Sequence, residues 1–157
     1  MAMNLALCES DPPGGRAAIL SIKPKYASLI LAGTKKVELR RTWPSQRIGV
    51  LVLYASSPVQ KFVGLAYLDK VVECELEELW CISNTHGGGV TYEELRAYLA
   101  EKPRAFGAMI SRVDVAKTAV DPKRIFRDFT PPQSLSFIRT SDFQTVVQSM
   151  FPSEATI

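Results

Sequence analysis

The feature that most constrains the fold is the stretch of residues 33–41, Gly-Thr-Lys-Lys-Val-Glu-Leu-Arg-Arg. Its second half alternates charged and apolar residues, which predicts a β-strand with two unlike faces. The charged face would carry Lys36, Glu38 and Arg40, and the apolar face Val37 and Leu39. Because the apolar face can pack against a core, the charged face is left available for binding or chemistry.

A short helix is predicted immediately before this strand, over residues 23–32. Pro24 suits the first turn of a helix, and Gly33 suits the left-handed residue that often follows a helix. Lys35 falls at the junction of helix and strand, where its ammonium group can approach the last helix carbonyls. We therefore expect Lys35, Glu38 and Arg40 to lie together, with Lys35 at the entrance to a cleft.

The length and composition indicate one globular domain. The chain has 157 residues, of which 46% are hydrophobic and 22% charged, so it can bury a substantial core. No apolar run is long enough to span a membrane, and the first residues lack the pattern of a signal peptide. We expect a soluble cytoplasmic protein without a membrane partner, and the sequence leaves its oligomeric state open.

The cysteines and the single histidine restrict the available chemistry. Cys8, Cys74 and Cys81 are an odd number of cysteines with no close pair, and His86 lies in a loop rich in glycine, where a solvated side chain is the expected state. We expect no disulfide, no metal site and no other cofactor. Any enzymatic chemistry must then be carried by Lys, Glu, Arg, Tyr or Ser residues.

Positive charge is concentrated in one part of the sequence. Residues 16–64 contain nine Lys and Arg residues and one acid, Glu38, a net charge of +8, whereas the remainder has a net charge of −5. Such a concentration is typical of a protein that binds an anionic partner, most simply a nucleic acid. The alternative is a solvated basic face, and the single acid among these bases favours a functional site instead.

The rest of the chain predicts a small α+β fold. Further strands are expected at residues 18–22, 48–55, 62–72, 105–115 and 135–139, and further helices at 73–82 and 91–101. Gly64 suggests a bulge or a close backbone approach inside a strand. Since helices do not alternate regularly with strands, we expect a mainly antiparallel β-barrel with helices at its rim rather than a doubly wound parallel sheet.

The two ends of the chain, Trp43 and a group of hydroxyl residues allow further predictions. Residues 1–17 read as a flexible lead-in, and residues 140–157 as a C-terminal helix or tail. Trp43 is either a surface on which a base stacks or a lid over the core. Hydroxyl groups gather at the end of one strand, where sites tend to lie: Tyr54, Ser56 and Ser57.

The pattern formed by Gly33, Lys35, Glu38 and Arg40 resembles the Gly-x-Lys-x-x-Glu-x-Arg signature of ASCH domains, which belong to the PUA-like superfamily of β-barrels. Residues 21–26, 54–58, 63–64 and 129–134 also resemble segments of ASCH proteins, so the likeness covers residues 18–139. It implies a PUA-like barrel with a cleft between the helix and the following strand, which holds RNA or a modified base.

The resemblance also implies possible activities. Some ASCH proteins are ribonucleases, and small bacterial acetylcytidine amidohydrolases of the family use a lysine, a threonine and a glutamate. Lys35 matches the lysine, and Glu38 stands where those enzymes have their threonine. We find no counterpart of their glutamate near Gly87, Gly88 and Gly89.

The charge state of Lys35 decides its chemistry. Burial and the nearby Arg40 would lower the pKa of Lys35, whereas Glu38 would raise it. A neutral Lys35 can act as a base or nucleophile, and a charged one as a phosphate ligand. We predict Lys35, Glu38 and Arg40 as catalytic residues. The predicted substrate-binding residues are Lys23, Lys25, Tyr26, Lys36, Arg41, Trp43, Tyr54, Ser56 and Ser57.

The sequence therefore predicts an ASCH domain that binds RNA or a modified nucleoside or nucleotide. If the domain is an enzyme, the predicted activity is that of a metal-independent ribonuclease or nucleoside amidohydrolase. Two alternatives remain. The domain can be a non-catalytic regulatory module that binds a small ligand or a protein partner, or Glu38 and Arg40 can form a structural ion pair beside a solvated Lys35.

Overall fold

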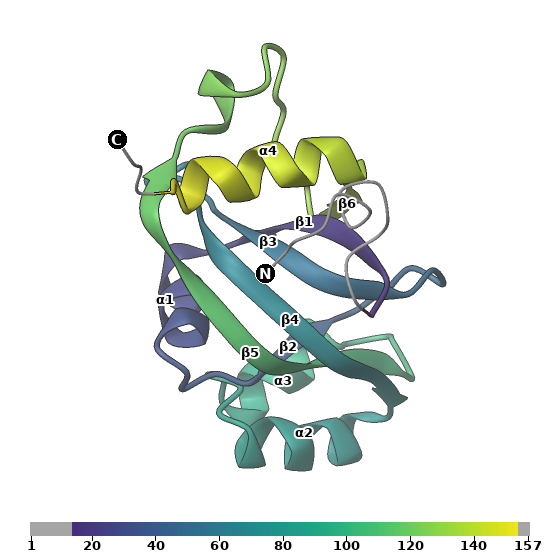
Figure 1. Ribbon diagram of the computed structural model, residues 1–157. Coiled ribbons are helices and arrows are strands. Elements are labelled where there is room, and N and C mark those ends of the chain that lie inside the picture. The colour runs from purple at the N-terminus through teal and green to yellow at the C-terminus, as the bar shows by residue number, and fades with distance from the viewer. Residues whose placement is uncertain (1–13, 154–157) are drawn as a thin grey trace.

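The computed structural model describes residues 14–153 and contains one curved, six-stranded sheet with the strand order β2-β5-β4-β3-β1-β6 (Figure 1). The strands are β1 (Arg16–Ile22), β2 (Val37–Arg40), β3 (Ile48–Ala55), β4 (Lys61–Cys74), β5 (Ala105–Val120) and β6 (Leu135–Phe137). The helices are α1 (Pro24–Leu31), α2 (Leu76–Thr85), α3 (Tyr92–Tyr98) and α4 (Thr140–Met150), with a 3-10 turn, η2, at Pro122–Arg124.

The sheet is mixed but mainly antiparallel, as predicted. Only β1 and β3 pair in parallel, and the other four pairings are antiparallel. The parallel pairing follows from the order of elements, because α1 and β2 lie between β1 and β3 and carry the chain back to the starting end. No ladder joins β2 to β6 within residues 14–153, so the sheet forms an open half-barrel. The predicted α+β fold with a mainly antiparallel sheet is confirmed, and the sheet is an open half-barrel rather than a closed barrel.

The curvature of the sheet comes from its two longest strands. β4 and β5 have 14 and 16 residues, and their pairing shifts register at three points. Gly64 lies beside one of these shifts, and a Cβ atom there would lie 2.6 Å from the carbonyl oxygen of Asp114. The predicted bulge and close approach at Gly64 are both present, and they bend the sheet toward a barrel.

The core lies on both faces of the sheet, which explains why β3 is buried along its whole length. Val50 and Val52 pack with Val146 and Met150 of α4, whereas Leu51, on the opposite face, packs with residues of α1. A third cluster joins the apolar face of β2 to α2 and α3. Figure 1 shows α4 across the top of the sheet and α2 and α3 together at its lower end.

Several boundaries differ from those predicted. β1 begins at Arg16, within the predicted lead-in, and residues 1–13 of that lead-in lie outside the described residues. β4 continues to Cys74, because that residue pairs with Ala105, so α2 begins later than predicted. α4 occupies the segment predicted as a C-terminal helix or tail.

None of the helices in residues 14–153 is long and apolar enough to cross a membrane.

Candidate functional site

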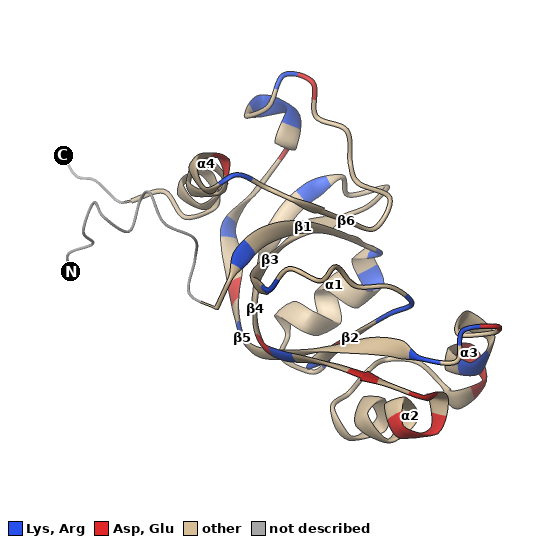
Figure 2. Ribbon diagram, turned by 90° about the vertical axis from the view of Figure 1, so that its right-hand side faces the viewer, with Lys and Arg blue, Asp and Glu red and all other residues tan. Residues whose placement is uncertain are grey.

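The open side of the half-barrel contains a cleft of about 560 Å³. It is lined by side chains from the ends of β1 and β3, from α1, β2 and α3, and from the loop before β6. Figure 2 shows β2 separated from β1 and β6, with α1 lying between them. The cleft therefore lies where the barrel fails to close.

Arg40 spans this open side. Its Nε donates to Oε2 of Glu38 at 2.8 Å, and its Nη2 lies 2.7 Å from the same oxygen. Nη1 donates to Oγ of Ser134 at 3.0 Å, and Nη2 donates to the carbonyl oxygen of Ser21 at 3.1 Å. One guanidinium group thus connects β2 to β1 and to the segment that leads into β6.

Lys35 is held by the turn that follows α1. Gly33 has a φ of +82°, and the backbone N–H groups of Thr34 and Lys35 both donate to the carbonyl oxygen of Leu29 at 3.0 Å. This turn directs the Lys35 side chain inward, where Nζ donates to the carbonyl oxygen of Gly88. Only 3% of Lys35 is exposed, so it lies at the buried floor of the cleft. The sequence analysis had placed it at the entrance.

The three charged groups form one buried cluster. Nζ of Lys35 lies 3.7 Å from Oε1 of Glu38, and the other carboxylate oxygen of Glu38 binds Arg40. The Lys35 ammonium also lies 5.3 Å from the centre of the Tyr26 ring. Two cations and one anion share this floor, so the protonated cluster has a net charge of about +1 and attracts an anion.

Burial is the main influence on Lys35. Desolvation lowers the pKa of Lys35 below its usual 10.5, Glu38 opposes this shift by charge and by hydrogen bonding, and Arg40 lowers the pKa further. The sequence predicted these three causes but left open which of them prevails, and in the structure burial does. Lys35 therefore loses its proton at a lower pH than an exposed lysine does. The resulting neutral amine lies next to a guanidinium that can bind an oxyanion.

Comparison with known proteins identifies the family. A model of the ASCH domain matches residues 20–116. A curated relative from Zymomonas mobilis subsp. mobilis, described as an ASCH domain-containing ribonuclease, is 30% identical over 142 residues, which are 88% of this chain and 95% of the relative. This chain belongs to the ASCH domain family.

Solved structures agree with this assignment. The crystal structure of ASCH from Zymomonas mobilis matches this ASCH domain with a TM-score of 0.78 at 27% identity, and the match covers 85% of this chain and 94% of the other. A serine-to-alanine mutant of the Zymomonas protein matches with a TM-score of 0.79 at 26% identity and covers 88% and 99% of the two chains.

The cleft of this ASCH domain brings together most of the residues predicted as its site. Besides the charged cluster, five predicted substrate-binding residues line the cleft, namely Lys23, Tyr26, Tyr54, Ser56 and Ser57. Burial and the charge of Asp121 raise the pKa of the Tyr54 hydroxyl, which keeps it protonated and able to donate a hydrogen bond.

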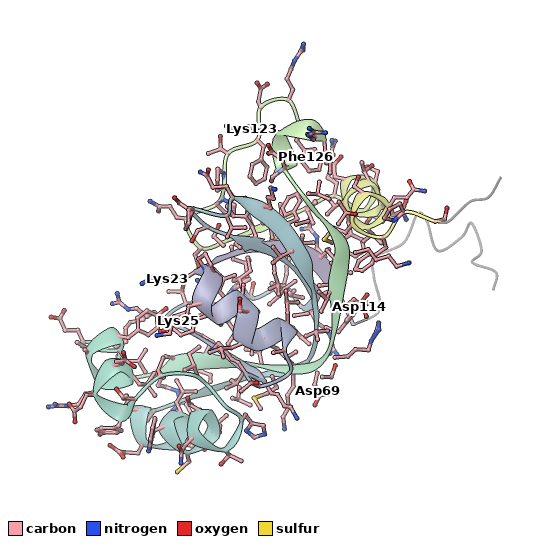
Figure 3. The ribbon with its side chains drawn as sticks, turned by 90° about the vertical axis from the view of Figure 1, so that its left-hand side faces the viewer. Lys23, Lys25, Asp69, Asp114, Lys123 and Phe126 are labelled. Carbon is pink, nitrogen blue, oxygen red and sulfur yellow. The ribbon has the colours of Figure 1, made fainter. Side chains whose placement is uncertain are left out.

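Four other predicted substrate-binding residues lie outside the cleft. Lys25 borders a neighbouring hollow formed with the Gly87–Gly89 loop, and Trp43 packs against the core beside a small hollow shared with Arg40. Lys36 and Arg41 are exposed on the surface and do not line the cleft. Figure 3 shows Lys23 and Lys25 projecting outward from the start of α1.

Several residues at the site were not predicted. The carbonyl oxygens of Gly88 and Ser21 hold Lys35 and Arg40, and the Ser134 hydroxyl holds Arg40 from the far side of the cleft. Residues of α3, including Glu94 and Tyr98, form part of the wall. The segment with Ser134 was visible in the family resemblance, but backbone carbonyls have no signature in a sequence.

His86, Cys74 and Cys81 do not line the cleft. His86 is partly buried, not fully solvated, and its Nδ1 lies 3.0 Å from the carbonyl oxygen of Ile82. Cys74 and Cys81 are free thiols, and Cys8 lies outside the described residues. Among residues 14–153, no group of three or more His, Cys, Asp or Glu side chains is arranged to hold a metal ion.

Proposed function

We propose that this ASCH domain binds single-stranded RNA in the cleft and cleaves it without a metal ion. The observation that carries the proposal is the buried cluster of Lys35, Glu38 and Arg40 at the floor of a cleft about 560 Å³ in volume. It combines an amine whose pKa is lowered by burial with a fixed guanidinium, which suits proton abstraction next to a phosphate.

The proposed reaction is attack of a ribose 2′-hydroxyl on the adjacent phosphorus. Neutral Lys35 takes the hydroxyl proton, the 2′ oxygen forms a bond to phosphorus, and the bond to the 5′ oxygen breaks. The departing oxygen takes up a proton, for which the protonated Tyr54 hydroxyl on the cleft wall is a suitable donor. The products are a 2′,3′-cyclic phosphate and a 5′-hydroxyl end.

Arg40 would stabilise the negative charge that develops on the phosphate. A guanidinium has five N–H groups, two of them on Nη1, and the Ser134 hydroxyl accepts a hydrogen bond from only one of these two. The second N–H of Nη1 is therefore available to a phosphate oxygen. Glu38 fixes the guanidinium and opposes the fall in the pKa of Lys35, so its proposed role is positioning and tuning of the other two groups.

The similarity to proteins of the family supports an RNA substrate. The relative of 30% identity that is described as a ribonuclease aligns over 95% of its own length. The basic residues between positions 16 and 64 also suit the phosphate backbone of a nucleic acid, and one of them, Lys23, lines the cleft. Both observations favour RNA over a neutral small ligand.

The decisive experiment uses a short RNA and the same sequence made of deoxynucleotides, both incubated with the protein in EDTA. We expect cleavage of the RNA only, with a cyclic phosphate product, because the nucleophile is the 2′-hydroxyl. Lys35→Met should abolish cleavage. Lys70→Met, a change at an exposed lysine on β4, is the matched control and should leave cleavage unchanged. Equal cleavage by the wild type and Lys35→Met would overturn the proposal.

A second candidate is RNA binding without cleavage. It is favoured by the contacts of Lys35 with the Gly88 carbonyl and the Glu38 carboxylate, because both acceptors stabilise the charged ammonium, which is a phosphate ligand and not a base. The same experiment separates the two candidates, since a binding module would retain the RNA but release no product. Incubating the protein with N4-acetylcytidine as a further substrate tests the amidohydrolase activity predicted from the family resemblance.

A further inference from the structure

One wall of the cleft is formed by α3, a helix to which the sequence analysis assigned no function. Glu94, Leu95 and Tyr98 of this helix line the cleft. Residues four positions apart lie on the same face of a helix, and both Glu94 and Tyr98 lie on the face of α3 that lines the cleft. Leu95 lies beside them and is buried in the core cluster below, which anchors this face of the helix.

Tyr98 offers an aromatic surface that the fold does not use. It is 42% exposed, and within residues 14–153 the exposed large hydrophobic residues are Val59, Tyr98 and Val115. Of these, Tyr98 lines the cleft. An exposed ring next to a cationic floor that attracts phosphate is suited to stacking on a nucleobase, since every base has a flat face that can lie against an aromatic side chain.

Glu94 offers a fixed carboxylate on the same face of α3 as Tyr98. Its Oε1 accepts a hydrogen bond from the backbone N–H of Thr91 at 2.8 Å, and its own N–H donates to Oγ1 of Thr91 at 3.1 Å. This capping box holds the side chain against the start of α3. The hydrogen bond from Thr91 lowers the pKa of Glu94, and the charge of Lys25 lowers it further, so the group is an anion that only accepts hydrogen bonds.

A carboxylate has about four acceptor positions, and the capping box occupies one of them. Among the four bases of RNA, guanine is the one whose Watson–Crick edge presents two adjacent donors, N1–H and the 2-amino group, which match the two oxygens of a carboxylate. The corresponding edges of adenine, cytosine and uracil each place an acceptor beside a donor and would bring a lone pair against the anion.

We propose, on the basis of the RNA-binding function above, that α3 selects the base: Tyr98 stacks on an unpaired guanine, and the Glu94 carboxylate accepts hydrogen bonds from its N1–H and 2-amino groups. The base must be unpaired because pairing with cytosine occupies both donors. The site therefore favours single strands that contain guanine, with the neighbouring phosphate over Lys35 and Arg40.

The test measures dissociation constants for five-nucleotide RNAs that carry guanine, inosine, adenine or uracil at the central position of an otherwise uridine strand. Inosine lacks the 2-amino group but keeps N1–H. We expect the wild type to bind the guanine strand about tenfold more tightly than the adenine or uracil strand, with inosine between them. Fluorescence anisotropy at constant salt concentration is a suitable measurement.

Two pairs of variants locate the effect. Glu94→Gln keeps the capping box, which glutamine also satisfies, but replaces the anion, so the preference for guanine should fall to about twofold or less. Glu93→Gln, at an exposed neighbour that contacts Arg96, should keep the preference. Tyr98→Ala should weaken binding of all four strands by about fivefold or more, and Tyr98→Phe should restore it.

The outcomes separate this inference from the function on which it rests. Wild-type binding of all four strands with equal affinity, or a guanine preference that survives in Glu94→Gln, would overturn base selection by α3 and leave the RNA-binding function intact. Absence of binding to every strand would overturn both. Loss of preference in Glu94→Gln alone, with the melting temperature unchanged, supports the assignment.

Discussion

Replacing Arg40 with alanine should destabilise this ASCH domain strongly, because the guanidinium connects both sides of the open half-barrel. The substitution removes the hydrogen bonds to Glu38, Ser21 and Ser134. It also leaves the Glu38 carboxylate, whose side chain is 7% exposed, with only Lys35 at 3.7 Å as a neighbouring cation. The expected result is therefore a loss of folding free energy rather than a local change in the cleft.

The magnitude follows from the burial of the pair. Removing one member of a buried ion pair costs about 3–5 kcal/mol, whereas an exposed pair contributes about 0–1 kcal/mol. The Arg40 side chain is 15% exposed, so we expect a value near the lower end of the buried range, about 3 kcal/mol. Glu38→Gln keeps a neutral acceptor for Arg40 and should cost less, about 1.5–2 kcal/mol.

Urea denaturation at neutral pH measures these losses as changes in the free energy of unfolding. The double mutant Glu38→Gln/Arg40→Ala should be more stable than the sum of the single losses predicts, by about 1–2 kcal/mol, because the two residues interact directly. A loss below about 1 kcal/mol in Arg40→Ala would refute the reasoning, since it would show that solvent screens the pair as on a surface.

Three further predictions concern the same site. Burial lowers the pKa of Lys35 in the folded state, so between that pKa and 10.5 the unfolded state binds more protons than the folded state. In this pH window the contribution of Lys35 to the free energy of unfolding, measured by urea denaturation, should increase as the pH rises. Glu38→Gln removes a group that raises this pKa, so the rise of any cleavage rate with pH should move to lower pH. Gly88→Ala would place a Cβ atom 1.9 Å from Oγ of Ser83, and thermal melting should show a loss of about 1–3 kcal/mol.

Local patterns in the sequence predicted much of the fold. The continuous apolar run at residues 48–55 indicated a strand covered on both faces, and α4 and α1 cover β3 in that way. The glycine inside β4 indicated a bulge, which is present at Gly64. These features were predictable because they depend on the side chains of a single strand.

The openness of the sheet was not predictable in the same way. Closure would require β2 and β6 to pair, and that depends on how far β4 and β5 curve between them. β5 continues to Val120, well beyond the predicted end, through residues that are largely exposed and show no hydrophobic alternation. Its length is set by pairing with β4, and such a partner is not visible in the sequence of β5 alone.

The charged cluster was predicted from strand alternation, but its surroundings were not. Alternation placed Glu38 and Arg40 on one face, and the structure joins them at 2.7 Å. The groups that bury the cluster come from distant positions: the Gly88 carbonyl is 53 residues from Lys35, and the Ser134 hydroxyl is 94 residues from Arg40. Burial and charge state therefore required the folded chain.

Lys35 is the residue of the cluster at which fold and chemistry can be separated. Arg40 cannot lose its charge and Glu38 lies between two cations, so substitution of either changes stability and function together. A buried lysine can instead become neutral, which limits what its burial costs, and methionine fills a similar volume without a charge. Lys35→Met should therefore change the free energy of unfolding by less than about 1 kcal/mol, as measured by urea denaturation, because Glu38 keeps its contacts with Arg40. Loss of RNA cleavage in a variant of unchanged stability would assign the chemistry to the amine, whereas strong destabilisation would show that the lysine is needed to hold the cluster together.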